Sequence, residues 1–208
     1  MKHQLKFLAL AVLLCSCSST SVEKTWKSPT YVGGPVKKVA VVAISDQGFV
    51  RTALENRLAR TIGARGQAAI PTAELLTLAQ IKEDKAAATA RLRQAGADSI
   101  LIMRLVDQAT YDRQVLASPA LFGTASMGYG ASDWYDYYSF GFTGMGVSYN
   151  SMRDYLVLDS SLFELATGVR LWSVVTQTVL KEDADRLVVA DKLAEKVAAQ
   201  LLNDKMIR

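Results

Sequence analysis

Cysteine and histidine, which serve widely as nucleophiles, bases and metal ligands, are scarce in this chain and lie at its start. The 208 residues hold two cysteines, Cys15 and Cys17, and one histidine, His3. A Ser-His-Asp triad, a Cys-His pair or a zinc site of the usual kind needs at least one of these side chains. Such chemistry would therefore have to use the first 17 residues.

Residues 1–16 have the order of a secretory signal peptide. Lys2 and Lys6 form a basic start, an apolar run follows at 7–14 (FLALAVLL), and small residues come next. A transmembrane helix needs about 20 apolar residues, so this run is too short to span a bilayer. We therefore expect residues 1–16 to be removed from the mature protein.

The end of this segment, Leu14-Cys15-Ser16-Cys17, resembles the lipobox of bacterial lipoproteins. In that family a branched apolar residue stands three positions before the lipidated cysteine, and a small residue stands just before it. Cys17 fits this spacing, whereas Cys15 would place bulky Leu14 at the small position. The resemblance implies that Cys17 carries acyl chains, which together hold a protein at a membrane essentially permanently. The alternative is an ordinary secretory signal with two incidental cysteines.

The location of the protein follows from the same resemblance. The family's signal for retention in the inner membrane, an Asp directly after the cysteine, is replaced here by Ser18. The resemblance therefore implies attachment to the bacterial outer membrane, with the domain facing the periplasm.

Removal of the signal peptide changes the chemistry available to the chain. The remaining residues contain 22 Lys and Arg against 20 Asp and Glu, with no His and no cysteine except Cys17. We expect no catalytic residues, no metal site and no cofactor, and hence no enzyme. No basic run or aromatic motif of an RNA-binding type appears, so we expect no nucleic-acid partner.

Three other groups of residues could be assigned chemistry, and for each the structural interpretation is preferred. Residues 33–38 (GGPVKK) lack the Gly-Lys-Ser/Thr ending of a phosphate loop and precede the first strand of the regular pattern. Two carboxylate pairs could act as acid and base or bind Ca²⁺, but solvated loop residues are the commoner explanation: Asp133 with Asp136, and Asp107 with Asp112. Arg104 interrupts an apolar strand, which predicts an ion pair on a sheet face.

The elements that position these residues begin after a tether. Residues 17–35 are rich in Ser, Thr, Gly and Pro and predict a flexible segment, although Trp26 and Tyr31 indicate that its end packs onto the domain. The domain itself, 36–208, starts with alternating elements. We predict strands at 39–44, 67–70 and 99–106, a helix at 50–62, one or two helical turns at 72–78, and a second full helix at 82–95.

The pattern then changes to two extended runs, 155–165 and 171–180, joined through Gly168 as a β-hairpin. A helix capped by Asp183 or Asp185 ends the chain. The sum is an α/β (α+β) domain with a single mixed sheet of about five strands, in which βαβαβ is followed by a β-hairpin and a C-terminal helix.

An insert at 117–150 interrupts this order. It is rich in Gly and Tyr, has few charges and shows no clear period. Aromatic side chains are enriched in interfaces, so we expect Trp134, Tyr135, Tyr137 and Tyr138 to bind a partner. The alternative is a disordered or locally folded hairpin whose rings cover their own domain, and contact with envelope sugars or with lipid is a third interpretation. We also expect the core to close without the insert.

Taken together, these residues resemble a group of uncharacterised bacterial lipoproteins. The shared features are the tether with Trp26 and Pro29, the Ala97-Asp98 pair before the central strand, the aromatic insert, and the hairpin sequence LFELATGVRLWS at 162–173. The order of elements is also similar to the α/β domain in the amino-terminal part of TolB, in the penicillin-binding-protein activator LpoB and in the periplasmic part of CsgG.

These resemblances imply a lipid-anchored, non-enzymatic envelope protein that docks an envelope partner or associates with itself, through the insert or an exposed sheet edge. The alternatives are a regulator of a peptidoglycan-synthesis or export enzyme and a hydrolase that uses carboxylates. Fold alone does not choose between them.

Overall fold

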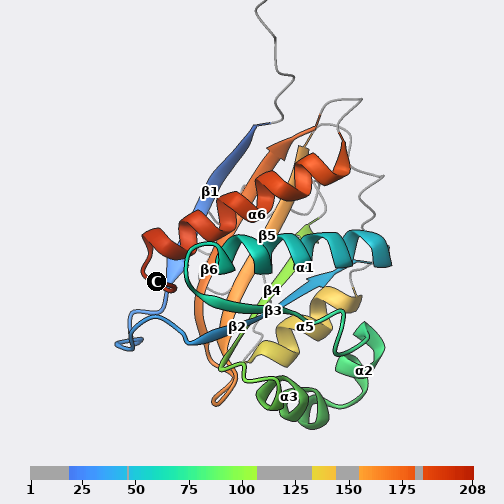
Figure 1. Ribbon diagram of the computed structural model, residues 1–208, viewed down its shortest axis with the longest axis vertical. Coiled ribbons are helices and arrows are strands. Elements are labelled where there is room, and N and C mark those ends of the chain that lie inside the picture. The colour runs from blue at the N-terminus through green and yellow to red at the C-terminus, as the bar shows by residue number, and fades with distance from the viewer. Residues whose placement is uncertain (1–18, 46, 107–132, 144–154, 181–184) are drawn as a thin grey trace, which may run out of the picture.

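A single mixed sheet forms the centre of the molecule in the computed structural model (Figure 1). The structure describes residues 19–45, 47–106, 133–143, 155–180 and 185–208. Within these ranges six strands lie in the order β1-β6-β5-β4-β2-β3. This confirms the predicted fold class, and one strand comes from a segment that was not expected to be in the sheet.

The first half of the domain is the predicted alternation of strands and helices. Its elements are β2 (Lys38–Ile44), α1 (Gly48–Gly63), β3 (Ala68–Pro71), α2 (Leu78–Glu83), α3 (Lys85–Gln94) and β4 (Ser99–Val106). β2 pairs in parallel with β3 on one side and with β4 on the other. Both faces of β2 and β4 are covered, which is why both strands are apolar almost throughout rather than alternating.

The helical part of this half differs from the prediction in one respect. Residues 72–76 form one hydrogen-bonded turn, in which the N–H groups of Leu75 and Leu76 donate to the carbonyl of Thr72. The predicted helix 82–95 is two helices divided at Asp84. The backbone of Asp84 is extended, and its carboxylate accepts the N–H of Ala87 at 2.9 Å. Asp84 therefore ends α2 and caps α3, and the signal for this break is an N-cap residue inside a helical pattern.

The second half is the predicted hairpin and terminal helix: β5 (Tyr155–Glu164), β6 (Arg170–Val179) and α6 (Arg186–Asn203). β5 pairs antiparallel with both β4 and β6. The turn uses Gly168 at φ +78°, a backbone conformation that L side chains rarely adopt. Asp185 caps α6 by accepting the N–H of Leu187, as one of the two predicted caps.

The expectation of a flexible tether is wrong for residues 20–27. They form β1 (Thr20–Lys27), which pairs antiparallel with β6 at the edge of the sheet. Every second side chain of β1 is exposed, the period expected of a strand with one covered face. The Ser- and Thr-rich composition suggested a linker, but Thr and Trp also favour strands. Residues 20–27 form a strand because the free edge of β6 supplies hydrogen-bonding partners for their backbone.

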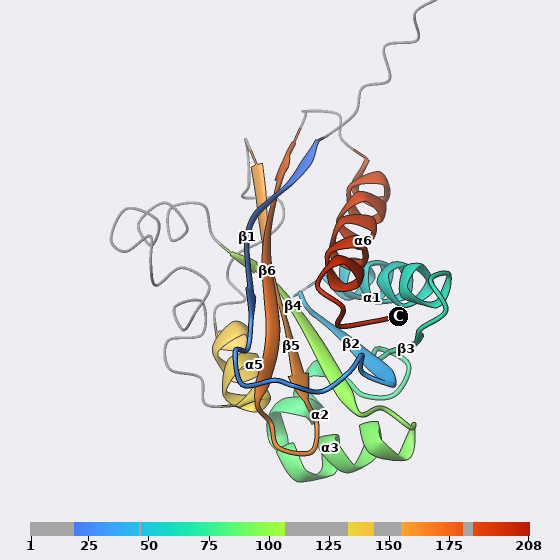
Figure 2. The same ribbon diagram turned by 90° about the vertical axis from the view of Figure 1, so that its left-hand side faces the viewer.

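Two layers of helices cover the sheet (Figure 2). α1 and α6 pack on one face, over a core that includes Val41, Leu101 and Trp172. α2, α3 and a helix from the insert, α5 (Trp134–Thr143), pack on the other face, over Val42 and Ile102. Within the described ranges, no helix has both the length and the apolar character needed to cross a bilayer.

The position of α5 contradicts the expectation that the core closes without the insert. Trp134, Tyr137 and Tyr138 are each at most 1 % exposed and belong to the second core. Their spacing of three and four residues places them on one face of a helix, a period obscured by the surrounding Gly and Tyr residues. Residues 117–132 and 144–150 of the insert lie outside the described residues.

Candidate functional site

The end of the sheet where the chain enters is the first region of interest, because the proposed lipid site lies there. Cys17 is outside the described residues, but Ser19 is already bonded to the sheet: its carbonyl accepts the N–H of Val179 at 3.0 Å. Thr20 lies opposite Thr178, and the two hydroxyl oxygens are 2.9 Å apart. With 3.8 Å per residue, the Cα of Cys17 cannot be more than about 7.6 Å from that of Ser19.

An apolar hollow lies at the same end of the sheet, on the face covered by α1 and α6. Its walls include Phe49 from the start of α1 and Leu187 from the start of α6, and its floor includes Leu105 and Leu156. Its free volume is about 20 Å³, enough for about one water molecule. None of the described residues that line the hollow is titratable, so these residues offer an apolar surface.

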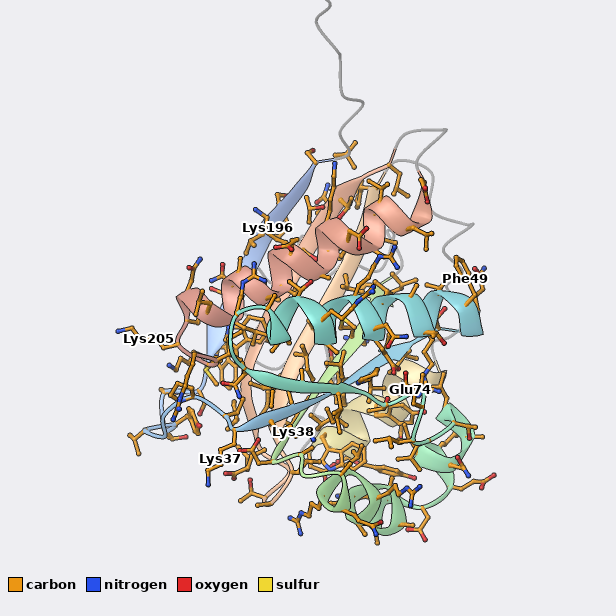
Figure 3. All side chains as sticks on the ribbon, viewed as in Figure 1. Lys37, Lys38, Phe49, Glu74, Lys196 and Lys205 are labelled. Carbon is orange, nitrogen blue, oxygen red and sulfur yellow. The ribbon has the colours of Figure 1, made fainter. Side chains whose placement is uncertain are left out.

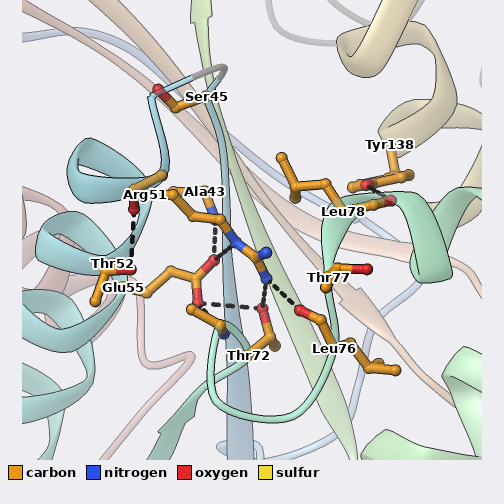
Figure 4. A network of polar contacts seen from close by, with 12 residues as sticks. Ala43, Ser45, Arg51, Thr52, Glu55, Thr72, Leu76, Thr77, Leu78 and Tyr138 are labelled. Carbon is orange, nitrogen blue, oxygen red and sulfur yellow. Dashed lines mark hydrogen bonds and ion pairs between the residues drawn. The ribbon is translucent and has the colours of Figure 1, made fainter.

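A buried ion pair fastens α1 to the sheet (Figure 4). Glu55 is fully buried, and one carboxylate oxygen accepts the Nε–H of Arg51 at 2.8 Å and the N–H of Ala43 at 3.0 Å. The other oxygen accepts the N–H of Ala73 at 2.6 Å and the hydroxyl of Thr72 at 3.2 Å.

The same network continues through the guanidinium of Arg51, which donates to the carbonyl of Leu76 at 2.8 Å and to Thr72 at 3.2 Å. Glu55 thus accepts four hydrogen bonds and its charge is paired, so it is engaged in holding β2, α1 and the segment after β3 together. Sequence reasoning missed this network. The available signal was a pair of opposite charges at i and i+4 beside the apolar stripe of the helix.

The second buried ion pair confirms the interpretation of Arg104. Its Nη2 lies 3.0 Å from a carboxylate oxygen of Asp159, which stands directly opposite on β5. Its Nε–H donates to the hydroxyl of Tyr137 at 3.2 Å, and its guanidinium lies 5.0 Å from the centre of that ring. Desolvation lowers the pKa of Arg104, but Tyr137 and Asp159 outweigh it, so the net effect raises the pKa.

Tyr137 is held as a neutral phenol in this arrangement. Burial is the largest cause, and with the nearby Asp159 charge it raises the pKa of the Tyr137 hydroxyl, against the lowering effect of Arg104. A phenol that stays protonated can donate or accept a hydrogen bond but is a poor general base. The Arg104, Asp159 and Tyr137 group therefore fixes α5 on the sheet and carries no reactive side chain.

The four aromatic residues expected to contact a partner all lie on α5. The three buried rings belong to the second core, and the hydroxyl of Tyr138 donates to the carbonyl of Leu78 in α2 at 2.5 Å. Tyr135 is partly exposed, and its hydroxyl donates to the carbonyl of Lys82. This is the alternative interpretation, in which the rings cover their own domain. A side chain buried within its own chain offers little surface to a partner.

Of the two candidate carboxylate pairs, only Asp133 with Asp136 lies in the described part of the chain. Asp133 pairs with Lys85 and accepts the N–H groups of Tyr135 at 2.8 Å and Asp136 at 3.1 Å, so it caps α5. Desolvation raises the pKa of Asp133, but Lys85 and the two N–H groups lower it by more. Asp107 and Asp112 lie outside the described residues. Across the part of the chain that the structure describes, no three His, Cys, Asp or Glu side chains gather as metal ligands.

The outer edge of β1 is the exposed sheet edge considered as a docking surface. It carries the charged side chains Glu23, Lys24 and Lys27, and its register with β6 shifts between Val22 and Lys24. Charges and irregular register are devices that discourage another strand from pairing with an edge. Strand addition at β1 is therefore disfavoured.

The described elements define a class of fold: one α/β domain with a mixed six-stranded sheet and helices on both faces. No model of a protein family matches the sequence, and no characterised protein matches it either. Among solved structures, the chain is similar to the PelC dodecamer from Paraburkholderia phytofirmans, with 14 % identity, coverage of 91 % of this chain and 99 % of that chain, and a TM-score of 0.47. It is also similar to lipoprotein GNA1162 from Neisseria meningitidis, with 13 % identity, coverage of 80 % and 97 %, and a TM-score of 0.41. These likenesses are distant and assign no function.

Proposed function

We propose that this chain is a lipid-anchored, non-enzymatic protein of the bacterial cell envelope, attached through Cys17 to the outer membrane and facing the periplasm. The observation that carries the proposal is the sequence Leu14-Cys15-Ser16-Cys17, which has lipobox spacing and is followed almost at once by the folded domain. The role of the domain is protein interaction or assembly.

The structure supports this proposal through the path from anchor to sheet. Only Ser18 and Ser19 stand between Cys17 and β1, and Ser19 is already hydrogen-bonded to β6. The acyl chains and the sheet are thus joined by a very short segment, which keeps the domain at the membrane surface. A protein with this arrangement samples the envelope close to its own membrane rather than across a long tether.

The non-enzymatic part of the proposal rests on the side chains left after cleavage. The mature sequence has no histidine and no cysteine besides Cys17. The buried carboxylates Glu55 and Asp159 are each paired with an arginine. A reaction would therefore have to use exposed carboxylates or hydroxyls without the usual general base.

Metabolic labelling with radioactive palmitate tests the anchor. We expect Cys17→Ala to abolish labelling and release of the signal peptide, and Cys15→Ala to leave both unchanged. Cys15→Ala is the matched control because it removes the same side chain two positions away. Equal labelling of the Cys17→Ala protein would refute the proposal, and separation of the membranes on a density gradient would show which of them holds the native protein.

Cross-linking in whole cells tests the interaction role. We expect the native protein to form cross-links with an envelope protein or with a second copy of itself. Recovery of the monomer alone from intact cells, at cross-linker doses that capture other envelope complexes, would contradict this role.

A further inference from the structure

Four exposed large apolar side chains lie toward the end of the sheet where Ser19 is hydrogen-bonded to β6. They are Phe49, Val179, Leu187 and Val188, which are 55 %, 47 %, 38 % and 45 % exposed. They come from three elements, the start of α1, the end of β6 and the start of α6. Phe49 projects from the outer end of α1 (Figure 3). Phe49 and Leu187 line the same hollow, and contiguous exposed apolar surface is typical of protein-interaction or membrane-contact sites.

The strand register shows how close these residues lie to Thr20, the first residue of β1. Thr20 lies opposite Thr178, which in turn lies opposite Leu156 in the floor of the apolar hollow. Strands in a sheet are about 4.8 Å apart, so the floor of the hollow is only about 10 Å across the sheet from Thr20. Val179 is closer still, because its N–H donates to the carbonyl of Ser19.

Both faces of the sheet contribute to this end. Leu156 points to the face of α1 and α6, where Phe49 and Leu187 form the rim of the hollow. Val179 follows Thr178 and points to the opposite face, where it lies across from Tyr155. Tyrosine combines an apolar ring with a polar hydroxyl, as do the side chains enriched at membrane interfaces.

The size of the hollow decides between two lipid occupants. A free volume of about 20 Å³ cannot admit an acyl chain from Cys17. Phe49 and Leu187 line the hollow and remain 55 % and 38 % exposed, so both can contact an apolar layer that covers this end. The bilayer surface, rather than an acyl chain inside the hollow, is therefore the lipid partner that fits this end of the domain.

We infer that this end of the domain is a membrane-contact surface, in which Phe49, Leu187 and Val188 enter the boundary between headgroups and acyl chains. The inference rests on the proposed anchor at Cys17. Three acyl chains fix one point, and a domain fixed at one point can still tilt. Apolar contact beside that point lowers the free energy of one orientation, so the sheet presents a constant face to the periplasm.

Depth-dependent fluorescence quenching on the mature, acylated protein tests the inference. The native protein offers no free thiol once Cys15 is cleaved and Cys17 is alkylated, so a cysteine placed at 187 or at 202 can be labelled uniquely. Leu202→Cys is the matched control: Leu202 is 41 % exposed and lies on the same helix, 15 residues and so about 22 Å from Leu187. Each labelled protein is reconstituted in vesicles of phosphatidylethanolamine and phosphatidylglycerol that contain acyl-spin-labelled lipid.

We expect the label on Leu187→Cys to shift to the blue and to be quenched by the spin-labelled lipid, and the label on Leu202→Cys to show neither change. Equal absence of quenching in protein that floats with the vesicles would overturn the contact surface while leaving the anchor intact. A blue shift at Leu187→Cys without lipid quenching would also overturn it, because protein would then cover the surface. Failure of the native protein to float would refute the anchor, and the contact surface with it.

Discussion

Removing one partner of the buried Arg104 and Asp159 pair should destabilise the domain severely. The Asp159 side chain is 1 % exposed and that of Arg104 is 9 % exposed, so either charge alone would remain out of water. Breaking such a pair costs about 3–5 kcal/mol, against a typical total stability of about 5–15 kcal/mol. We therefore expect Asp159→Val and Arg104→Met each to lower the free energy of unfolding by about 3–5 kcal/mol.

The double variant Arg104→Met/Asp159→Val separates the loss of the pair from the cost of an isolated charge. It buries no charge, and we expect it to lie within about 1–2 kcal/mol of the native protein, since replacing a buried ion pair by apolar residues is often nearly neutral. Urea unfolding monitored by circular dichroism gives the free energy of unfolding of the native protein, the two single variants and the double variant. Equal m-values would show that the substitutions leave the denatured state unchanged. The exposed pair of Arg65 and Glu195 is the control, with an expected cost of Arg65→Met below about 1 kcal/mol. Single variants that cost less than about 1 kcal/mol, or costs that simply add, would refute the role given to this pair.

Three further predictions concern the core, the insert and pH. Leu101→Asp places an unpaired charge in the central strand β4 and should abolish the cooperative melting transition measured by circular dichroism. Replacing 117–150 by a short Gly-Ser linker should also prevent folding, because it removes Trp134, Tyr137 and Tyr138 from the second core; a normal melting curve would show that α5 is dispensable. The pKa of Asp133 is lowered in the folded state, so its pairing stabilises the domain above the ordinary carboxyl pKa, and this contribution is lost as pH falls through the lowered value. Titration by NMR should place the pKa of Asp133 below its usual value, and Lys85→Met should raise it.

The sequence was sufficient to predict an element where a single hydrophobic pattern ran through the whole segment. Parallel strands covered on both faces are apolar throughout, so β2 and β4 were recognisable, and a glycine between two extended runs indicated the β5 and β6 hairpin. The ion pair of Arg104 was predictable because a single charge in a buried strand needs an oppositely charged partner. Its partner was not predictable, since Asp159 could be chosen only once the register of β4 and β5 was known.

The sequence was insufficient where a long-range partner decided the outcome. β1 resembles a linker in composition, and it becomes a strand because the edge of β6 is available 158 residues later. The helical period of α5 is carried by aromatic residues among glycines, which conceals an otherwise ordinary buried face. The membrane-contact surface was invisible for the same reason, because its residues come together only through the packing of α1 and α6 against the sheet.

The pairing of the first strand with the last has a consequence for export. If the chain is exported from its amino end, as the proposed function implies, residues 20–27 are delivered early, but their partner, residues 172–178, arrives only after most of the domain. Contacts between such distant residues form slowly, because a long loop must close before any hydrogen bond is gained. The edge of the sheet nearest the proposed anchor is therefore completed last. Until then β1 lacks its hydrogen-bonding partner, and α6, which follows β6 in the chain, has yet to cover the same sheet.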